Sequence, residues 1–468
     1  MKTEIIENQT YDELQVGDTA QLTRTVNQGD IELFAAASGD FNPSHVDQSY
    51  ADEHQMGQLV AHSMWGSSLF SSLLGNVLPG PGTVYRNQNM NFHRPVFLGD
   101  TLTAKVTVSA KRPDFRTVIF ECQAFNGHDD MVITGTAEVT APGSKIRRTR
   151  VDLPGFETGR QDRFAELIAQ GAGLEAPPTA IAHPCDSSSL TAALEAAKAG
   201  FIVPILVGPE AKIRAVAEAN ELDLNGVTVV EAEHSHAAAE KAVELVRSGA
   251  AEVLMKGSLH TDELLGAVVR TGTGLRTERR LSHVFILDVP TYSKLLMVTD
   301  AAINIFPNLD DKRDICQNAI NLAHALGISQ PKVALLSAVE DVRTKIPSTL
   351  EAAALCKMAD RGQITGALLD GPLAMDNAIS KKAAITKGIR SEVAGDADIL
   401  LAPDLEAGNI LVKQLTFLGN ADAAGLALGA RATIILTSRA DSLRVKLASC
   451  AMAKLDAHHR RKLREIPL

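Results

Sequence analysis

The pattern that most restricts the fold of this chain begins at about Phe164, where short apolar segments start to alternate with amphipathic stretches. Two such pairs come first, 179–182 before 190–199 and 203–207 before 210–220. Further apolar segments lie at 227–230, 253–255, 284–287, 332–336, 366–369 and 399–402. Strands that alternate with helices of about ten or more residues are typical of parallel βαβ units. Residues 163–468 are therefore predicted to form an α/β domain.

The N-terminal part has a different pattern, in which one apolar helix precedes a series of strands. The run that ends at Val77 is small or apolar nearly all round, which predicts a helix buried on every side. Strand-like segments follow at 84–92, 101–111, 117–126 and 131–140. One buried helix wrapped by an antiparallel sheet is the hot-dog architecture. Residues 1–142 are therefore predicted to form an α+β hot-dog domain.

Residues 143–162 are predicted to be an exposed linker between the two domains. Proline and glycine stand at 142–143 and again at 154–155, and a basic run occupies 145–150. The basic run has two interpretations, which are solvated linker charge and contact with the phosphate of a ligand.

Composition indicates a large cytoplasmic protein. The chain has 468 residues, and 45% of them are hydrophobic, which is enough for about three domain-sized units with their own cores. A net charge of -10 argues against general affinity for nucleic acid. We expect no membrane segment, because no secretory leader and no apolar run of about 18 residues is recognisable. The five cysteines are scattered and predict neither a disulfide framework nor a metal site.

The segment 38–47 carries a carboxylate and an imidazole on a loop that is rich in turn residues. Asp40 and His45 follow the helical run 30–37, which Gly39 and Pro43 interrupt, so the two side chains can point to one place. A carboxylate can activate water and an imidazole can carry a proton near neutral pH, which suits addition of water to a polarised double bond. The alternative is an aspartate that caps a turn and a histidine at the surface.

With this loop and the segment Leu78-Pro-Gly-Pro-Gly, residues 10–142 resemble the MaoC-like (R)-specific enoyl-CoA hydratases. The resemblance implies that Asp40 and His45 activate water and handle the proton on a trans-2-enoyl thioester, and that Asn42 orients them. It also implies that backbone amides around Ser63 bind the thioester carbonyl. Many relatives have glycine in place of Ser63. His62 is predicted to be a packing or helix-entry residue.

Polar segments of the α/β domain stand where predicted strands end. They lie at 255–258, 274–277, 402–409 and 436–442 and combine hydroxyl, amide and guanidinium groups. Ligands of open α/β sheets bind at the carboxyl ends of strands, and arginine with serine and backbone amides suits a phosphate or acyl phosphate. No GxxxxGK[ST] loop is present, and the glycines at 271–274 lack the spacing of a dinucleotide site. The sequence is therefore weak evidence for an NAD or ATP site.

Residues 163–455 resemble the phosphate acetyltransferase and phosphate butyryltransferase family. The matching motifs occur in family order at 299–304, 317–319, 370–373, 402–404 with 408–409, and 437–442. The resemblance implies transfer of an acyl group between coenzyme A and inorganic phosphate without metal or redox cofactor. It also implies two α/β lobes with a cleft between them, related to the isocitrate and isopropylmalate dehydrogenase fold, and usually a dimer.

The resemblance also suggests individual roles in this domain. Arg439 would bind the phosphate, and Ser438 would hydrogen-bond the thiol sulfur or the tetrahedral centre. In the acetyl branch an aspartate seven residues after the serine is the base that takes the thiol proton. This chain has Val445 at that position, so Asp441 is the candidate for the base here. Asp441 could equally cap the following helix.

Three further side chains are substrate-binding candidates of this domain: Lys256, Arg276 and Asn409. The acetyl branch carries an arginine near 264–266, where this chain has Gly266, and Arg270 lies one helical turn further on. This departure favours the butyryl-like branch.

The prediction is a bifunctional homo-oligomer whose two domains handle acyl-CoA, CoA, phosphate and acyl phosphate. In one alternative the hot-dog domain only binds acyl-CoA beside a phosphate butyryltransferase, and in another the whole chain is a non-catalytic acyl-CoA sensor. A decarboxylating 2-hydroxyacid dehydrogenase is disfavoured, because the adjacent Asp310 and Asp311 would point apart on a helix.

Overall fold

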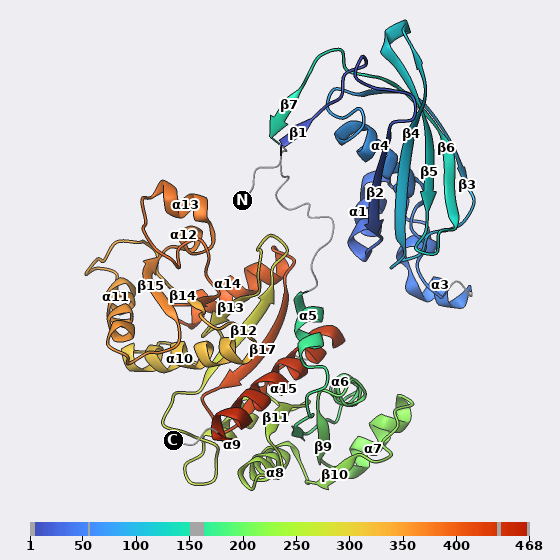
Figure 1. Ribbon diagram of the computed structural model, residues 1–468. Coiled ribbons are helices and arrows are strands. Elements are labelled where there is room, and N and C mark those ends of the chain that lie inside the picture. Colours follow the sequence, from blue (N-terminus) through green and yellow to red (C-terminus); the bar gives the residue numbers. More distant parts are fainter. Residues whose placement is uncertain (1–4, 55–56, 150–162, 438–440, 466–468) are drawn as a thin grey trace. The chain divides into compact units, whose positions relative to one another are not determined.

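The computed structural model describes residues 5–54, 57–149, 163–437 and 441–465. The chain divides into a first unit, Met1–Gln161, and a second unit, Asp162–Leu468. Figure 1 shows a sheet with helices in each of them. Among the helices that the structure describes, none combines the length and the apolar content needed to cross a membrane.

The first unit contains a five-stranded antiparallel sheet in the order β2-β4-β5-β6-β3. Its strands are β2 (Thr19–Thr25), β3 (Val84–Phe92), β4 (Thr101–Arg112), β5 (Thr117–Phe125) and β6 (Met131–Thr140). Inward and outward residues alternate along β4, as expected for strands with one face on a core. The predicted strand series is therefore confirmed to within a residue at each end.

Helix α4 (Ser63–Asn76) packs against this sheet. Phe70, Leu73 and Leu74 are fully buried and meet sheet residues such as Phe120 in one apolar core. The prediction of a helix buried on every side is wrong, because Met64 is 58% exposed and Ser63 and Ser68 face outward. Small side chains are compatible with both environments, so the sequence could not separate the two faces.

Three shorter helices lie before α4 in the chain. They are α1 (Gln28–Ser38), α2 (Pro43–Val46) and α3 (Gln48–Glu53). The first unit also extends beyond residue 142, since β7 (Arg147–Thr149) pairs with β1 (Ile5–Glu7). Within the basic run, Lys145 forms ion pairs with Glu13 and Glu7. The part of the predicted linker at 150–162 lies outside the described residues.

The second unit is built on one sheet of eleven strands, in the order β10-β9-β8-β11-β18-β17-β12-β13-β16-β14-β15. The strands are β8 (Pro178–Ala182), β9 (Val203–Gly208), β10 (Thr228–Glu231), β11 (Val253–Lys256), β12 (Ser282–Asp288), β13 (Leu296–Thr299), β14 (Lys332–Leu336), β15 (Leu368–Leu373), β16 (Ile399–Leu401), β17 (Asp422–Leu428) and β18 (Thr433–Ile435).

Helices cover this sheet: α5 (Arg163–Gln170), α6 (Ser187–Lys198), α7 (Glu210–Ala219), α8 (Ser235–Arg247), α9 (Thr261–Val269), α10 (Leu309–Ala325), α11 (Pro347–Asp360), α12 (Met375–Ile379), α13 (Lys381–Thr386), α14 (Leu405–Phe417) and α15 (Leu443–Glu465). Figure 1 shows the long α15 crossing the sheet near β17 and β11. Fully buried residues of α15, including Cys450 and Met452, belong to the main core of the unit.

The sheet is mixed, whereas the sequence predicted parallel βαβ units throughout. Strands β8 to β11 and β18 run parallel, as do β13 to β16, but β17 is antiparallel to both β18 and β12. Strand β12 is also antiparallel to β13. Most residues of β12 and β17 are buried, and the central residues of both strands show no alternation of apolar and polar side chains. This is the pattern expected of parallel strands.

Candidate active sites

Asp40 and His45 come together in the first unit, as the sequence predicted. Gly39 follows the last residue of α1 and turns the chain with a φ of 76°, and Asn42 caps α2 by accepting a hydrogen bond from the Ser44 amide. His45 Nε2 lies 3.9 Å from Asp40 Oδ2. Asn42 thus supports the loop that carries both groups.

The His45 ring is oriented by the backbone. Its Nδ1 lies 2.6 Å from the carbonyl oxygen of Val60, and a carbonyl can only accept, so Nδ1 carries the proton. In the neutral ring Nε2 then presents its lone pair on the side of Asp40. The Asp40 side chain is 53% exposed, whereas that of His45 is 14% exposed. A substrate can therefore approach the carboxylate while the imidazole stays in place.

His62, which the sequence treated as a packing residue, also belongs to this cluster. Its Nε2 donates to the Asp40 carbonyl oxygen at 2.9 Å, and its ring centroid lies 3.9 Å from that of His45. Ligand atoms of Asp40, His45 and His62 all lie within 4.8 Å of one another, the one such grouping among the described residues. No local signal marked His62, because it follows Asp40 by 22 residues.

Ser63 is the first residue of α4 and is exposed. The first amides of a helix have no acceptor within the helix, so they can donate to an oxygen placed at this end. The preceding residue, His62, makes no side-chain cap, which leaves the end of α4 open to such an oxygen.

In the second unit, the carboxyl ends of β8 and β11 form a tightly joined edge. Ala182 pairs with Lys256, and the Gly257 amide donates to the Ala182 carbonyl at 2.9 Å. A Cβ atom on Gly257 would lie 2.4 Å from the Ala182 oxygen and 2.6 Å from the His183 oxygen. Glycine is therefore required for this close approach.

Ser258 joins the same edge to His183. Its hydroxyl donates to the His183 carbonyl oxygen at 2.7 Å and lies 2.9 Å from His183 Nδ1. The sequence pointed to Ser258 only as part of a polar segment and to His183 not at all, because 75 residues separate them. Partial burial, with Lys212 nearby, holds the pKa of His183 below its ordinary value.

Two buried lysines lie at this edge of the sheet. Lys256 is 7% exposed, and its Nζ donates to the Gly257 and Leu259 carbonyls at 3.3 and 3.4 Å. Lys446 of α15 donates to Ser188 Oγ at 2.5 Å, in the first turn of α6. Buried cations beside helix N-termini favour a bound anion. Lys446 was missed because its partner lies 258 residues earlier.

Ser438 and Arg439 lie outside the described residues. Asp441 is described and half-buried just before α15. Ser442 Oγ accepts a hydrogen bond from the Val445 amide at 3.3 Å, which is the capping geometry that the sequence had offered as the alternative role of Asp441.

The structure separates Arg276 and Asn409 from this edge. Arg276 forms an isolated β-bridge with Ala430, which comes before the first residue of β18. Arg276 therefore lies at the opposite end of the sheet from Lys256. Asn409 donates to the Ala301 carbonyl at 3.1 Å and fastens α14 to the loop after β13. Asn304 of that loop donates to Leu281, directly before β12, which places the loop at the same end as Arg276.

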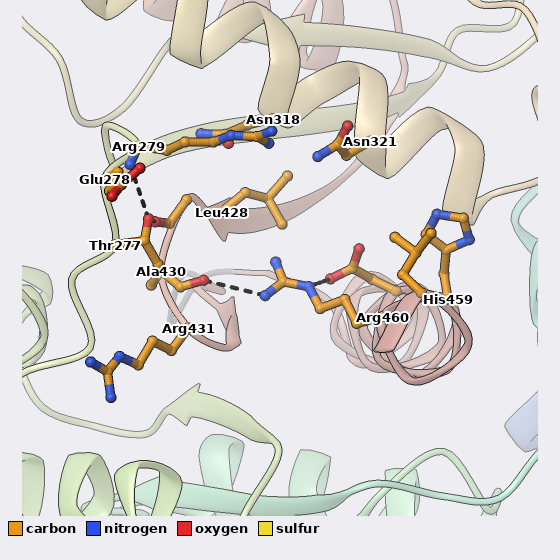
Figure 2. A pocket seen from close by; sticks show the side chains of 13 residues that line it. Thr277, Glu278, Arg279, Asn318, Asn321, Leu428, Ala430, Arg431, His459 and Arg460 are labelled. Atoms are coloured by element: carbon orange, nitrogen blue, oxygen red, sulfur yellow. Dashed lines mark hydrogen bonds and ion pairs between the residues drawn. The ribbon is translucent and has the colours of Figure 1, made fainter. Parts of the chain in front are cut away.

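This opposite end contains two neighbouring pockets. One, of about 520 Å³, is lined by Arg279, Arg431, Arg460 and residues of α10, and Figure 2 shows Arg460 reaching the Ala430 carbonyl across its floor. The other, of about 500 Å³, is lined by Arg276, Arg280 and Asn304. The predicted phosphate-binding residues thus fall at two ends of the sheet, with Lys256 and Asp441 at one and Arg276 at the other.

Comparison with known proteins follows the two-unit organisation. Residues 13–124 match the MaoC like domain, and residues 235–454 match the phosphate acetyl/butaryl transferase model. The phosphate acetyltransferase of Rhizobium meliloti is 63% identical over 300 residues, which are 64% of this chain and 95% of that protein. The chain belongs to the phosphate acetyl/butyryltransferase family. A MaoC-like domain is fused to the N-terminal side of its acyltransferase domain.

Other relatives extend the comparison. The phosphate butyryltransferase of Clostridium acetobutylicum is 43% identical over 294 residues, covering 63% of this chain and 98% of that protein. A branched-chain phosphotransacylase from Enterococcus faecalis has a TM-score of 0.54 at 32% identity, over 60% of this chain and 99% of that one. The R-hydratase PhaJ1 from Pseudomonas aeruginosa is 40% identical over 32% of this chain and 97% of that one, with a TM-score of 0.32. The second unit therefore has the phosphotransacylase α/β fold. The match of residues 13–124 to the MaoC like domain identifies the first as a hot-dog-like MaoC domain.

Proposed function

We propose that the second unit transfers an acyl group between coenzyme A and inorganic phosphate. The 63% identity to a phosphate acetyltransferase is the observation that carries this proposal. The edge formed by Lys256, Ser258 and Lys446 supports it, because buried ammonium groups and helix N-termini suit phosphate oxygens. Identity is higher to the relative named for acetyl than to the one named for butyryl, so acetyl is the expected acyl group, with butyryl as the second candidate.

The test of acyl transfer needs neither NAD nor a metal. The intact chain is mixed with coenzyme A and acetyl or butyryl phosphate, and thioester absorbance is followed. We expect thioester to form with at least one acyl phosphate, and a larger kcat/KM with acetyl. Absence of thioester with both would contradict the proposal.

We further propose that the first unit hydrates trans-2-enoyl-CoA to (R)-3-hydroxyacyl-CoA. The Asp40 carboxylate and the Nε2 lone pair of His45, 3.9 Å apart, suit one water molecule between them, and this geometry carries the proposal. Asp40 and His45 would draw the proton from that water as it adds to the β-carbon and return a proton to the α-carbon. Amides at the start of α4 would hold the thioester oxygen as negative charge develops on it.

Asp40→Asn tests this role. The change keeps the size of the side chain but removes the base, so hydration of crotonyl-CoA is expected to fall by about 10²-fold or more. Acyl transfer by the same protein should be unchanged. Glu32→Gln, on an exposed turn of α1, is the matched control and should alter neither activity.

Two results of this experiment would contradict the proposal. Undiminished hydration in Asp40→Asn would exclude Asp40 as a base. Binding of enoyl-CoA by the wild-type chain without any hydration would favour the second candidate function, in which the first unit only binds acyl-CoA.

We also propose a homo-oligomer. Light scattering of the intact chain should give a mass of at least two chains, each of 49.8 kDa. A mass of one chain at micromolar concentration would exclude it.

A further inference from the structure

Acyl transfer from an acyl phosphate to coenzyme A needs a group that takes the thiol proton, because the thiolate is the nucleophile. The aspartate that the resemblance implies for this role is absent, since Val445 stands at its position. His183 directly follows β8, at the edge where Lys256 ends β11 and Ser258 begins the next loop. It therefore lies beside the proposed phosphate-binding edge.

Hydrogen bonds determine which ring nitrogen of His183 is protonated. Ser258 Oγ gives its proton to the His183 carbonyl oxygen at 2.7 Å, and it accepts from the Cys185 amide at 3.3 Å. The hydroxyl also lies 2.9 Å from His183 Nδ1, and with its own proton on the carbonyl oxygen it accepts the hydrogen of Nδ1. Nε2 then holds the lone pair, and among the described residues it has no hydrogen-bond partner. This is the arrangement that a general base needs.

The surroundings of the ring favour the neutral form. Partial burial is the main reason that the pKa of His183 lies below its ordinary value, and the positive charge of Lys212 acts in the same direction. The carboxylates of Glu263 and Asp186 also face the ring and oppose this effect. At neutral pH the imidazole is therefore ready to accept a proton.

The backbone holds His183 in a conformation that few residues other than glycine, asparagine, aspartate and histidine adopt. Its φ is 55°, in the left-handed region. Its amide donates to Val207 at 2.7 Å, and its carbonyl accepts from the Ser258 amide at 2.9 Å. Backbone strain that is held by several hydrogen bonds is concentrated at functional sites in proteins.

We propose that His183 is the general base of acyl transfer in this chain. Nε2 takes the proton from the coenzyme A thiol as the sulfur forms a bond to the acyl carbon. The bond from that carbon to the phosphate oxygen breaks, and inorganic phosphate leaves with its electron pair. The imidazolium then returns the proton to phosphate or solvent, so that acyl phosphate and thiol become thioester and phosphate. The inference rests on the proposed acyl transfer.

His183→Asn is the test variant, because asparagine tolerates the left-handed backbone and its amide can still donate to Ser258 Oγ. It has no basic nitrogen. In the wild-type chain, kcat/KM for coenzyme A should fall as the pH drops through the pKa of His183, below about 6.5. In His183→Asn, kcat/KM should be about 10²- to 10⁴-fold lower at pH 7.5, and this acid limb should disappear.

His234→Asn is the matched control. His234 caps α8 by accepting from the Ala237 amide, and asparagine is an equally good cap, so rate and pH profile should be unchanged. Ser258→Ala is a second variant, which tests the same role if His183→Asn does not fold. It removes the acceptor of Nδ1–H, and we expect about a tenfold loss with the acid limb retained but displaced.

Three outcomes would overturn the inference. The first is a His183→Asn variant, or a Ser258→Ala variant if the former does not fold, with the wild-type rate and acid limb. The second is loss of the acid limb in Asp441→Asn together with its retention in His183→Asn, which would assign the base to Asp441. The third is a wild-type chain without acyl transfer, which would overturn the proposed function and the inference with it.

Discussion

At Gly257, the addition of a single methyl group should strongly reduce acyl transfer. In Gly257→Ala the new Cβ would lie 2.4 Å from the Ala182 oxygen, 2.6 Å from the His183 oxygen and 2.7 Å from the His183 carbonyl carbon. All three are backbone atoms, so no side chain can rotate away. The ends of β8 and β11 must separate, and His183 must move with them.

The size of both effects can be estimated. Overpacking of this kind costs about 1–3 kcal/mol, which lowers the melting temperature by roughly 2–4 °C for each kcal/mol in a domain of comparable size. Misplacement of a catalytic group by about 1 Å costs about 10²-fold in rate. We therefore expect a kcat/KM for acyl transfer about 10²-fold below wild type, measured by thioester absorbance, with hydration unaltered.

Gly266→Ala is the control for this prediction. Gly266 lies within α9, and a Cβ there meets nothing within 4 Å, so alanine should leave the melting temperature equal or slightly higher. A Gly257→Ala protein with acyl transfer within about twofold of wild type would refute the reasoning, because the sheet edge would then tolerate separation without loss of geometry.

Two further predictions concern stability. Arg163→Met removes the guanidinium that lies 2.7 Å from the fully buried Asp288, so urea denaturation should show a loss of about 3–5 kcal/mol. Arg214→Met, at an exposed ion pair on α7, should cost less than about 1 kcal/mol, and equal losses would contradict the argument. Burial lowers the pKa of His283 to about 4 in the folded chain, whereas the ordinary pKa of about 6.5 applies in the unfolded chain. Between these two pH values the unfolded chain binds a proton that the folded chain does not bind. Stability should therefore fall as the pH drops from 6.5 to 4, by up to about 1.4 kcal/mol per pH unit, and His283→Gln should flatten that slope in urea titrations.

Much of the first unit was predictable because its signals are local. The alternation along 101–111 reports one buried face, and the observed β4, Thr101–Arg112, follows it. Gly39 and Pro43 interrupt the helix between Asp40 and His45, and the two side chains do meet. The place of His62 in this cluster was not predictable, because 22 residues separate it from Asp40 and no local sequence pattern indicates the contact.

In the second unit, the positions of strands were predictable and their directions were not. Buried strands such as β12 and β17 have the same apolar composition whether their neighbours are parallel or antiparallel. Direction decides at which end of the sheet a loop emerges. Lys256 is the last residue of β11, whereas Arg276 lies in the loop before β12, and the two residues lie at opposite ends of the sheet.

The sequence by itself determined the family, the two-domain order and the proximity of Asp40 and His45 in the first unit, because motifs of a few residues encode these features. Only the tertiary structure decided which polar groups share a site in the second unit. His183 and Ser258 are 75 residues apart, and Lys446 and Ser188 are 258 apart. Such contacts arise when strands from distant segments pair in one register, and pairing depends on the packing of the whole sheet rather than on any local pattern.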